Sequence, residues 1–159
     1  MAFTVSKVFT TYITDIMNNT TAMDVNTDAL LEVALFSDTV VPDQTVTSAN
    51  SAYGAGVWAA NHITDTGTGA PAGWPTLGRP LSGVTSTFGT TLYTFAASDT
   101  VSGTATTTLA ATTGCLVYDH SAGIVTDQGF CFNYFGGPAS VTLGTFTVHW
   151  GSGVITIQC

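Results

Sequence analysis

Asp24, Asn26 and Asp28 place three side-chain oxygen groups at alternate positions, which is the spacing of the first ligands in an EF-hand calcium loop. The remainder of that loop is missing from the sequence. Ala29 stands where the loop has glycine, and Leu35 stands where it has a bidentate glutamate. We therefore predict a polar turn whose side chains bond the local backbone, and no metal site.

Asp119, His120 and Ser121 are the three residue types of a serine-hydrolase triad, but they are consecutive in the chain. A nucleophile, its base and the orienting acid must converge from separated positions, which neighbours on one turn cannot do. The other histidines, His62 and His149, share no metal-ligand spacing with His120. The sequence thus predicts no catalytic, metal or cofactor site, and we do not expect an enzyme.

Charged side chains are scarce in this chain. They make up 8% of its 159 residues, the net charge is -8, and Lys7 and Arg79 are the only strong cations. Nucleic-acid binding needs several cations to neutralise phosphates, so we expect none. With 45% hydrophobic residues the chain can bury a sizeable core, and we expect one domain over 1–159.

Neither the N-terminus nor the cysteines indicate export or a membrane. The chain starts without the basic region and apolar run of a signal peptide, and no stretch approaches the roughly 18 apolar residues of a membrane span. We expect synthesis in a cytoplasm. Cys115, Cys131 and Cys159 are odd in number and lack CxxC spacing, which argues against a disulfide framework or a zinc site. We expect Cys115 and Cys131 to be buried thiols.

The N-terminal region has a helical pattern. Apolar residues recur at i, i+3, i+4 and i+7 over about 5–18, which predicts one short amphipathic helix. Thr4 or Ser6 can cap its start, and Asn18-Asn19 can end it. The apolar stripe consists of Val5, Val8, Phe9, Tyr12, Ile13, Ile16 and Met17. Its polar face lacks a basic cluster, so we expect the stripe to pack on the sheet or on a neighbouring subunit.

Several short segments have the composition of strands. Residues 30–36 predict a largely buried strand, and further strands are expected over 92–97, 104–109 and 115–118. Glu32 lies inside the first of these segments. Two interpretations of it stay open, a charge on a sheet edge that blocks wrong pairing or one half of a buried pair.

The C-terminal third consists of apolar or alternating runs separated by Gly-Gly-Pro and Gly-Ser-Gly. Segment 145–150 alternates as a half-buried strand does. Its apolar face carries Phe146, Val148 and Trp150, and its polar face carries Thr145, Thr147 and His149. The glycines of 151–153 suit a tight hairpin, after which Ile155 and Ile157 resume the alternation. We predict a terminal β-meander in an all-β, antiparallel sandwich or barrel-like fold with one N-terminal helix.

Segment 50–85 is the irregular part of the chain, rich in glycine and proline. A long segment with little pattern is usually functional or mobile. We therefore take its large side chains, Tyr53, Trp58, Trp74 and Arg79, as candidate interface residues. Trp74 lies between Gly and Pro, so its ring would lose little entropy on docking.

Both ends of the chain resemble a known family of virion proteins. MAFTVSKVF at 1–9, DALLEVALF at 28–36 and the run 129–159 are similar, in pattern and order, to the small minor capsid or head-decoration proteins of tailed bacteriophages. The resemblance covers roughly the first forty and last fifty residues. It implies a structural protein on the outer surface of the virion capsid, bound to the major capsid protein and assembled as a homotrimer.

A second function class stays open beside this one. A tail-associated or receptor-binding β-domain that recognises a cell-surface glycan would use Trp58, Trp74 and Tyr53 as stacking platforms.

Overall fold

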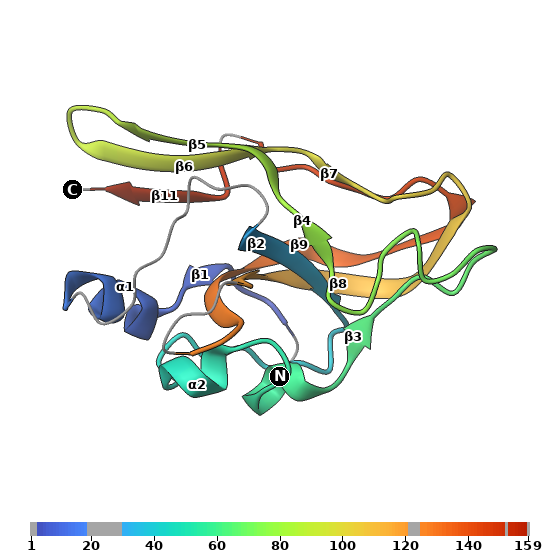
Figure 1. Ribbon diagram of the computed structural model, residues 1–159, viewed down its shortest axis with the longest axis horizontal. Helices are drawn as coiled ribbons and strands as arrows, with labels where there is room; N and C mark the ends of the chain where they lie inside the picture. Colours follow the sequence, from blue (N-terminus) through green and yellow to red (C-terminus); the bar gives the residue numbers. More distant parts are fainter. Residues whose placement is uncertain (1–2, 19–29, 121–124, 152, 159) are drawn as a thin grey trace.

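The computed structural model describes residues 3–18, 30–120, 125–151 and 153–158. These residues form mostly antiparallel β-sheet with few helices, which confirms the all-β prediction. Figure 1 shows three layers: a central sheet, further strands over one of its faces, and short helices with the N-terminal chain over the other. The sequence-predicted turn at Asp24, Asn26 and Asp28 lies outside the described residues, as do Ser121 and Cys159.

The central sheet has the strand order β1-β9-β8-β2-β3, with β4 also paired to β2. Its strands are β1 (Lys7–Val8), β2 (Leu31–Phe36), β3 (His62–Ile63), β4 (Arg79–Pro80), β8 (Thr107–Asp119) and β9 (Gln128–Gly144). The buried strand expected over 30–36 is confirmed as β2. The strands expected over 104–109 and 115–118 are instead one strand, β8, because Thr112 and Gly114 between them also pair with β9.

A second layer of strands covers one face of the central sheet (Figure 1). Its larger part has the order β11-β6-β5, and β10 pairs with β7 beside it. The bounds are β5 (Ser82–Phe88), β6 (Leu92–Ser98), β7 (Thr100–Val101), β10 (Thr147–Val148) and β11 (Ile155–Gln158). The strand expected over 92–97 is confirmed as β6.

The sequence-predicted C-terminal hairpin is wrong in its pairing, although its turn and its faces are right. Phe146, Val148 and Trp150 are buried, as the alternation indicates. The backbone N–H of Gly153 donates to the Trp150 carbonyl at 2.9 Å, and both flanking glycines have positive φ. Beyond the turn, however, β10 pairs with β7 and β11 pairs with β6. The two strands separate because each finds its partner in the β6–β7 region.

An aromatic cluster fills the other face of the central sheet. The covering elements are α2 (Ser48–Ser51) and η2 (Gly56–Ala59), so segment 50–85 contains more regular structure than its sequence predicts. Trp58 of η2 is buried, with its ring centroid 5.0 Å from that of Phe36 and 5.9 Å from that of Phe132. Phe3 and Phe9 complete the cluster at 6.1 and 6.2 Å from Trp58. Trp58 is therefore a core residue.

The N-terminal helix is shorter than predicted. It spans α1 (Thr10–Met17), and its N-cap residue Phe9 makes no side-chain capping bond, so the caps expected at Thr4 or Ser6 are wrong. The chain before it stays extended because β1 pairs with β9 and the Phe9 N–H donates to the Phe130 carbonyl. Within the described residues, no helix has the length and apolar character needed to cross a membrane.

Candidate binding cleft

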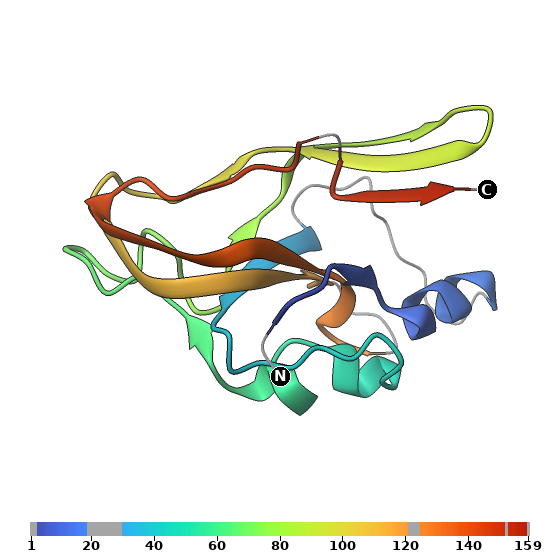
Figure 2. The same ribbon diagram turned by 180° about the vertical axis from the view of Figure 1, so that it is seen from behind.

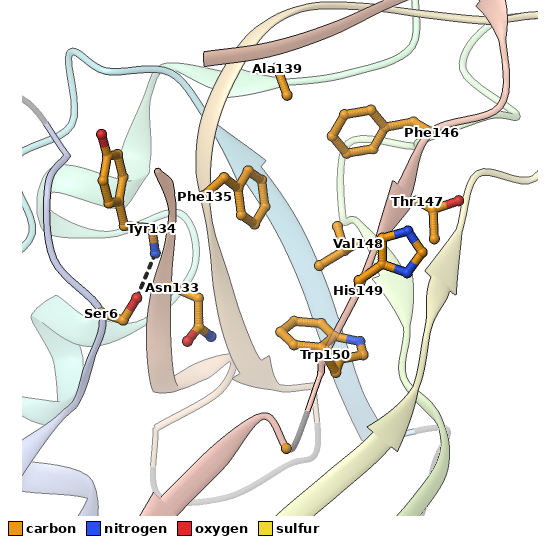
Figure 3. Close-up of a pocket in the computed structure, with 11 residues that line it drawn as sticks. Ser6, Asn133, Tyr134, Phe135, Ala139, Phe146, Thr147, Val148, His149 and Trp150 are labelled. Atoms are coloured by element: carbon orange, nitrogen blue, oxygen red, sulfur yellow. Dashed lines mark hydrogen bonds between the residues drawn. The ribbon is translucent and has the colours of Figure 1, made fainter. Parts of the chain in front are cut away.

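A cleft of about 440 Å³ opens between the two sheets where β9 faces segment 146–150 (Figure 3). In Figure 2, β1 and β9 lie in the central sheet and β11 lies in the layer of strands above it. Asn133 and Phe135 of β9 line one wall, and Phe146, Val148 and Trp150 line the other.

An irregularity in β9 shapes the first wall. Tyr134 pairs with Gly114 and Ala139 pairs with Thr112, so residues 135–138 of β9 lie opposite Thr113 alone. Gly136 and Gly137 take φ values of 85° and 155° in this bulge, a region that glycine enters without strain. Gly-Gly-Pro therefore does not end a run, as the sequence suggested. It bulges a continuous strand, and the Phe135 ring at the bulge projects toward the opposite wall (Figure 3).

Trp150 fixes the opposite wall. Its indole Nε1 donates to the Thr100 Oγ1 at 3.0 Å, which ties segment 146–150 to β7. Trp150, Phe146 and Val148 are each buried, and the alternation of the segment places their side chains on the face that meets the cleft. This wall is thus apolar, and its indole N–H is already satisfied.

Polar groups stand at the rim of the cleft. The Nδ1 of His149 lies 2.7 Å from the Asp99 Oδ2, and the Asp99 Oδ1 accepts from the Trp150 N–H at 3.3 Å. The hydrogen bond from His149 lowers the pKa of Asp99 below its ordinary value. On the other side, the Ser6 Oγ accepts from the Tyr134 N–H at 2.8 Å. The cleft therefore combines apolar walls with the Ser6 hydroxyl and the Asn133 amide.

This arrangement is suited to binding. No group of three or more histidine, cysteine or acidic residues within the described part of the chain could hold a metal ion. Asp99 is a carboxylate beside the cleft, and it holds the rim together through its contacts with His149 and the Trp150 N–H. The geometry thus offers contact and hydrogen bonding to a small ligand.

The structure does not bring the four sequence-predicted interface residues onto one exposed surface. Trp58 and Trp74 are buried, so their expected role as exposed contacts is wrong. Trp74 packs edge-on against Phe146, behind the cleft, at a centroid distance of 5.8 Å. Tyr53 is half-buried and donates from its hydroxyl to the Thr76 carbonyl at 2.5 Å. Arg79 is half-buried on β4, where it faces Val33 of β2.

Glu32 lies on a central strand, since β2 has β8 on one side and β3 and β4 on the other. Its interpretation as a charge on a sheet edge is therefore wrong. No ion pair joins it to another described residue, and burial raises its pKa above the ordinary value although His120 and Arg79 oppose that rise. Asp119, His120 and Ser121 are the consecutive residues that resemble a hydrolase triad. The His120 side chain contacts Asp127, and the His120 Nδ1 and the Asp127 Oδ1 are 2.6 Å apart.

The residues that form the cleft were not candidates at the level of sequence. Phe135 reads as one apolar residue among many, and His149 lies 50 positions from Asp99. One sequence feature could have indicated the cleft, namely the Gly-Gly-Pro tripeptide inside a long stretch without charged residues. Such a tripeptide is typical of a bulge as well as of a turn. No family model, curated protein or solved structure matches this chain, so the cleft is interpreted from its own geometry.

Proposed function

We propose that the protein is a structural subunit of a tailed-bacteriophage virion that binds the outer surface of the capsid shell. Its partner in this proposal is the major capsid protein, and its copies form a homotrimer. The observation that supports the proposal is an exposed apolar surface at one end of the molecule. We define this end surface by Ile13, Ile16, Met17 and Phe88.

The end surface joins two elements that are far apart in the chain. Helix α1 and the tip of the β5–β6 hairpin lie at the same end of the molecule (Figures 1 and 2). Between them runs a groove of about 250 Å³, whose lining includes Ile13, Ile16, Met17 and Tyr93. Phe88 pairs with Tyr93 across the hairpin and so shares its face of the sheet.

The exposure of these side chains points to a partner. Met17 is 81% exposed and Phe88 is 69% exposed, and segment 82–98 contains no charged residue. Contiguous exposed apolar side chains in soluble proteins mark interaction surfaces. A contact of this kind gains its free energy from apolar burial, so salt should weaken it little.

Cosedimentation with empty shells of the major capsid protein tests the proposal. The protein should pellet with the shells at low salt and near 1 M, where the Debye length is only about 3 Å. Phe88→Ser and Met17→Gln should each weaken shell binding about tenfold or more. Leu143→Asn is the matched control, because Leu143 is 59% exposed at the end of β9 and lies outside the end surface.

Two outcomes would overturn the proposal. Release of the protein by high salt would indicate an ionic contact, and unchanged binding of both end-surface variants would place the contact elsewhere.

Light scattering should give the mass of three chains for the free or released protein. Imaging of particles with and without the protein distinguishes the alternative function, because density only on the tail would favour a receptor-binding domain.

A further inference from the structure

We infer that the cleft between β9 and segment 146–150 is a binding site for a neutral saccharide. This inference does not rest on the proposed attachment to a capsid shell, because the cleft and the end surface have no lining residue in common. It requires only that the open side of the sandwich is accessible to solvent.

The size and shape of the cleft suit a small ligand. Its volume of about 440 Å³ lies in the roughly 300–1,000 Å³ range of small-molecule sites. The bulge at 135–138 aims Phe135 into it from β9, and Trp150 is held on the opposite wall by its bond to Thr100. Bulges commonly re-aim a side chain next to a functional site. The two walls are thus set before any ligand arrives.

Electrostatics favours an uncharged ligand. The chain carries a net charge of -8, which disfavours an anion near its surface. A cation would need a carboxylate, and none of the described residues that line the cleft is acidic. No lysine or arginine is found among these described lining residues either. A charged ligand would therefore be desolvated without a counter-charge.

The mixture of groups favours a saccharide over an apolar ligand. Phe135 offers a ring face, while Asn133 on the same strand and Ser6 beside it offer amide and hydroxyl groups. A sugar ring has the matching character, since it presents C–H groups on its faces and hydroxyls on its edges. A purely apolar ligand would bury these polar groups without partners, which costs roughly 1–3 kcal/mol for each group.

An extended peptide fits the same place poorly. Strand addition needs a regular row of backbone N–H and C=O groups along the free edge of β9. The bulge at 135–138 interrupts that row beside the cleft, and Pro138 has no N–H to donate. The experiment must therefore distinguish saccharide binding from peptide binding.

Titration with sugars, followed by the indole N–H signals of the three tryptophans in NMR spectra, tests the inference. Glucose, maltose, lactose and diacetylchitobiose are the neutral probes, and glucuronate is the charged match for glucose. At least one neutral probe should shift the Trp150 signal with a Kd near 1 mM or tighter. The Trp58 signal is the internal control, because Trp58 is buried on the far face of the central sheet.

Variants separate the cleft from other surfaces. Phe135→Ala and Asn133→Ala should each weaken saccharide binding about tenfold, because one removes the ring and the other removes the amide that line the cleft. Phe88→Ser should bind the saccharide normally. Conversely, Phe135→Ala should still pellet with capsid shells, so that failure of one proposal is distinguishable from failure of the other.

Three outcomes would overturn the inference. The first is an unmoved Trp150 signal with all four neutral sugars at about ten times the expected Kd. The second is glucuronate binding as tightly as glucose. The third is a shift of Trp150 by an uncharged extended peptide but by none of the sugars.

Discussion

The indole Nε1 of Trp74 donates a hydrogen bond to the backbone carbonyl of Val33, 3.1 Å away, and both residues are fully buried. Val33 lies in β2, an interior strand of the central sheet. This bond attaches the glycine- and proline-rich segment to the core. A segment whose composition suggests a mobile contact arm is thus anchored by the very side chain that was expected to dock on a partner.

Replacement of Trp74 should therefore affect the fold. We expect Trp74→Ala to lower the free energy of unfolding by about 3–5 kcal/mol, the usual cost of removing a buried indole. Trp74→Phe keeps part of the packing but removes the donor to Val33, and should cost less. Urea denaturation followed by circular dichroism measures both changes. An unfolding midpoint of Trp74→Ala equal to that of the natural chain would contradict the anchoring role.

Asp65 holds the same segment through three backbone donors. Its carboxylate accepts from the N–H groups of Gly67 at 2.7 Å, Gly73 at 2.9 Å and Thr108 at 2.9 Å. Asp65→Asn can keep an oxygen for Gly67 and Thr108, but it then turns its amide N–H₂ toward the Gly73 N–H, and we expect a loss of about 1–3 kcal/mol in the free energy of unfolding at neutral pH. Asp38→Asn, at an exposed position, is the control and should change stability little.

The effect of Asp65 should depend on pH. Burial by itself would raise the pKa of this carboxyl, but the three backbone N–H groups outweigh it and the pKa is lowered. A lowered pKa contributes stability above the unfolded value of about 3.9 and loses it as pH falls through the folded value. The stability difference between the natural chain and Asp65→Asn should thus narrow below about pH 4. A difference that stays constant over this range would contradict the assignment.

Alternation along a strand was predictable because it reflects local geometry. Phe146, Val148 and Trp150 are buried as a period of two requires, and the buried strand β2 follows from its apolar run. The partners of β10 and β11 were not predictable, since pairing depends on where β6 and β7 lie. The start of α1 was missed for the same reason, because Val8 fits a helical stripe but is held extended by Cys131 of β9.

The cleft could not be predicted from the sequence, because it also depends on which strands lie side by side. Its walls come from Phe135 and Trp150, and the rim pair joins Asp99 to His149 across 50 positions. Composition identifies large aromatic residues as candidates without saying which are buried. Trp58 and Trp74 were preferred because they lie in an irregular segment, yet a large ring gains most by burial, and both entered the core.

The two described cysteines should be unreactive in the folded protein. Burial raises the pKa of Cys131 to about 12 and also raises that of Cys115, so neither thiol provides thiolate near neutral pH. In a Cys159→Ser variant, we expect no fast labelling by iodoacetamide at about pH 8 and labelling of both thiols after unfolding. Mass spectrometry counts the labelled sites. Fast labelling of either thiol in the folded variant would show that its burial is wrong.

Phe146 and Phe88 provide a matched pair of phenylalanines in opposite environments. Phe146 is 7% exposed with its ring edge-on to Trp74, whereas Phe88 is 69% exposed at the hairpin tip. We expect Phe146→Ala to cost about 3–5 kcal/mol in the free energy of unfolding, because it removes a buried ring and leaves a cavity. Phe88→Ala should change it by no more than about 0.5 kcal/mol, because no buried contact is lost. Chemical denaturation of the two variants side by side measures the difference. Equal costs would show that Phe88 is buried in the free protein, and the end surface proposed for shell binding would then be unavailable for that contact.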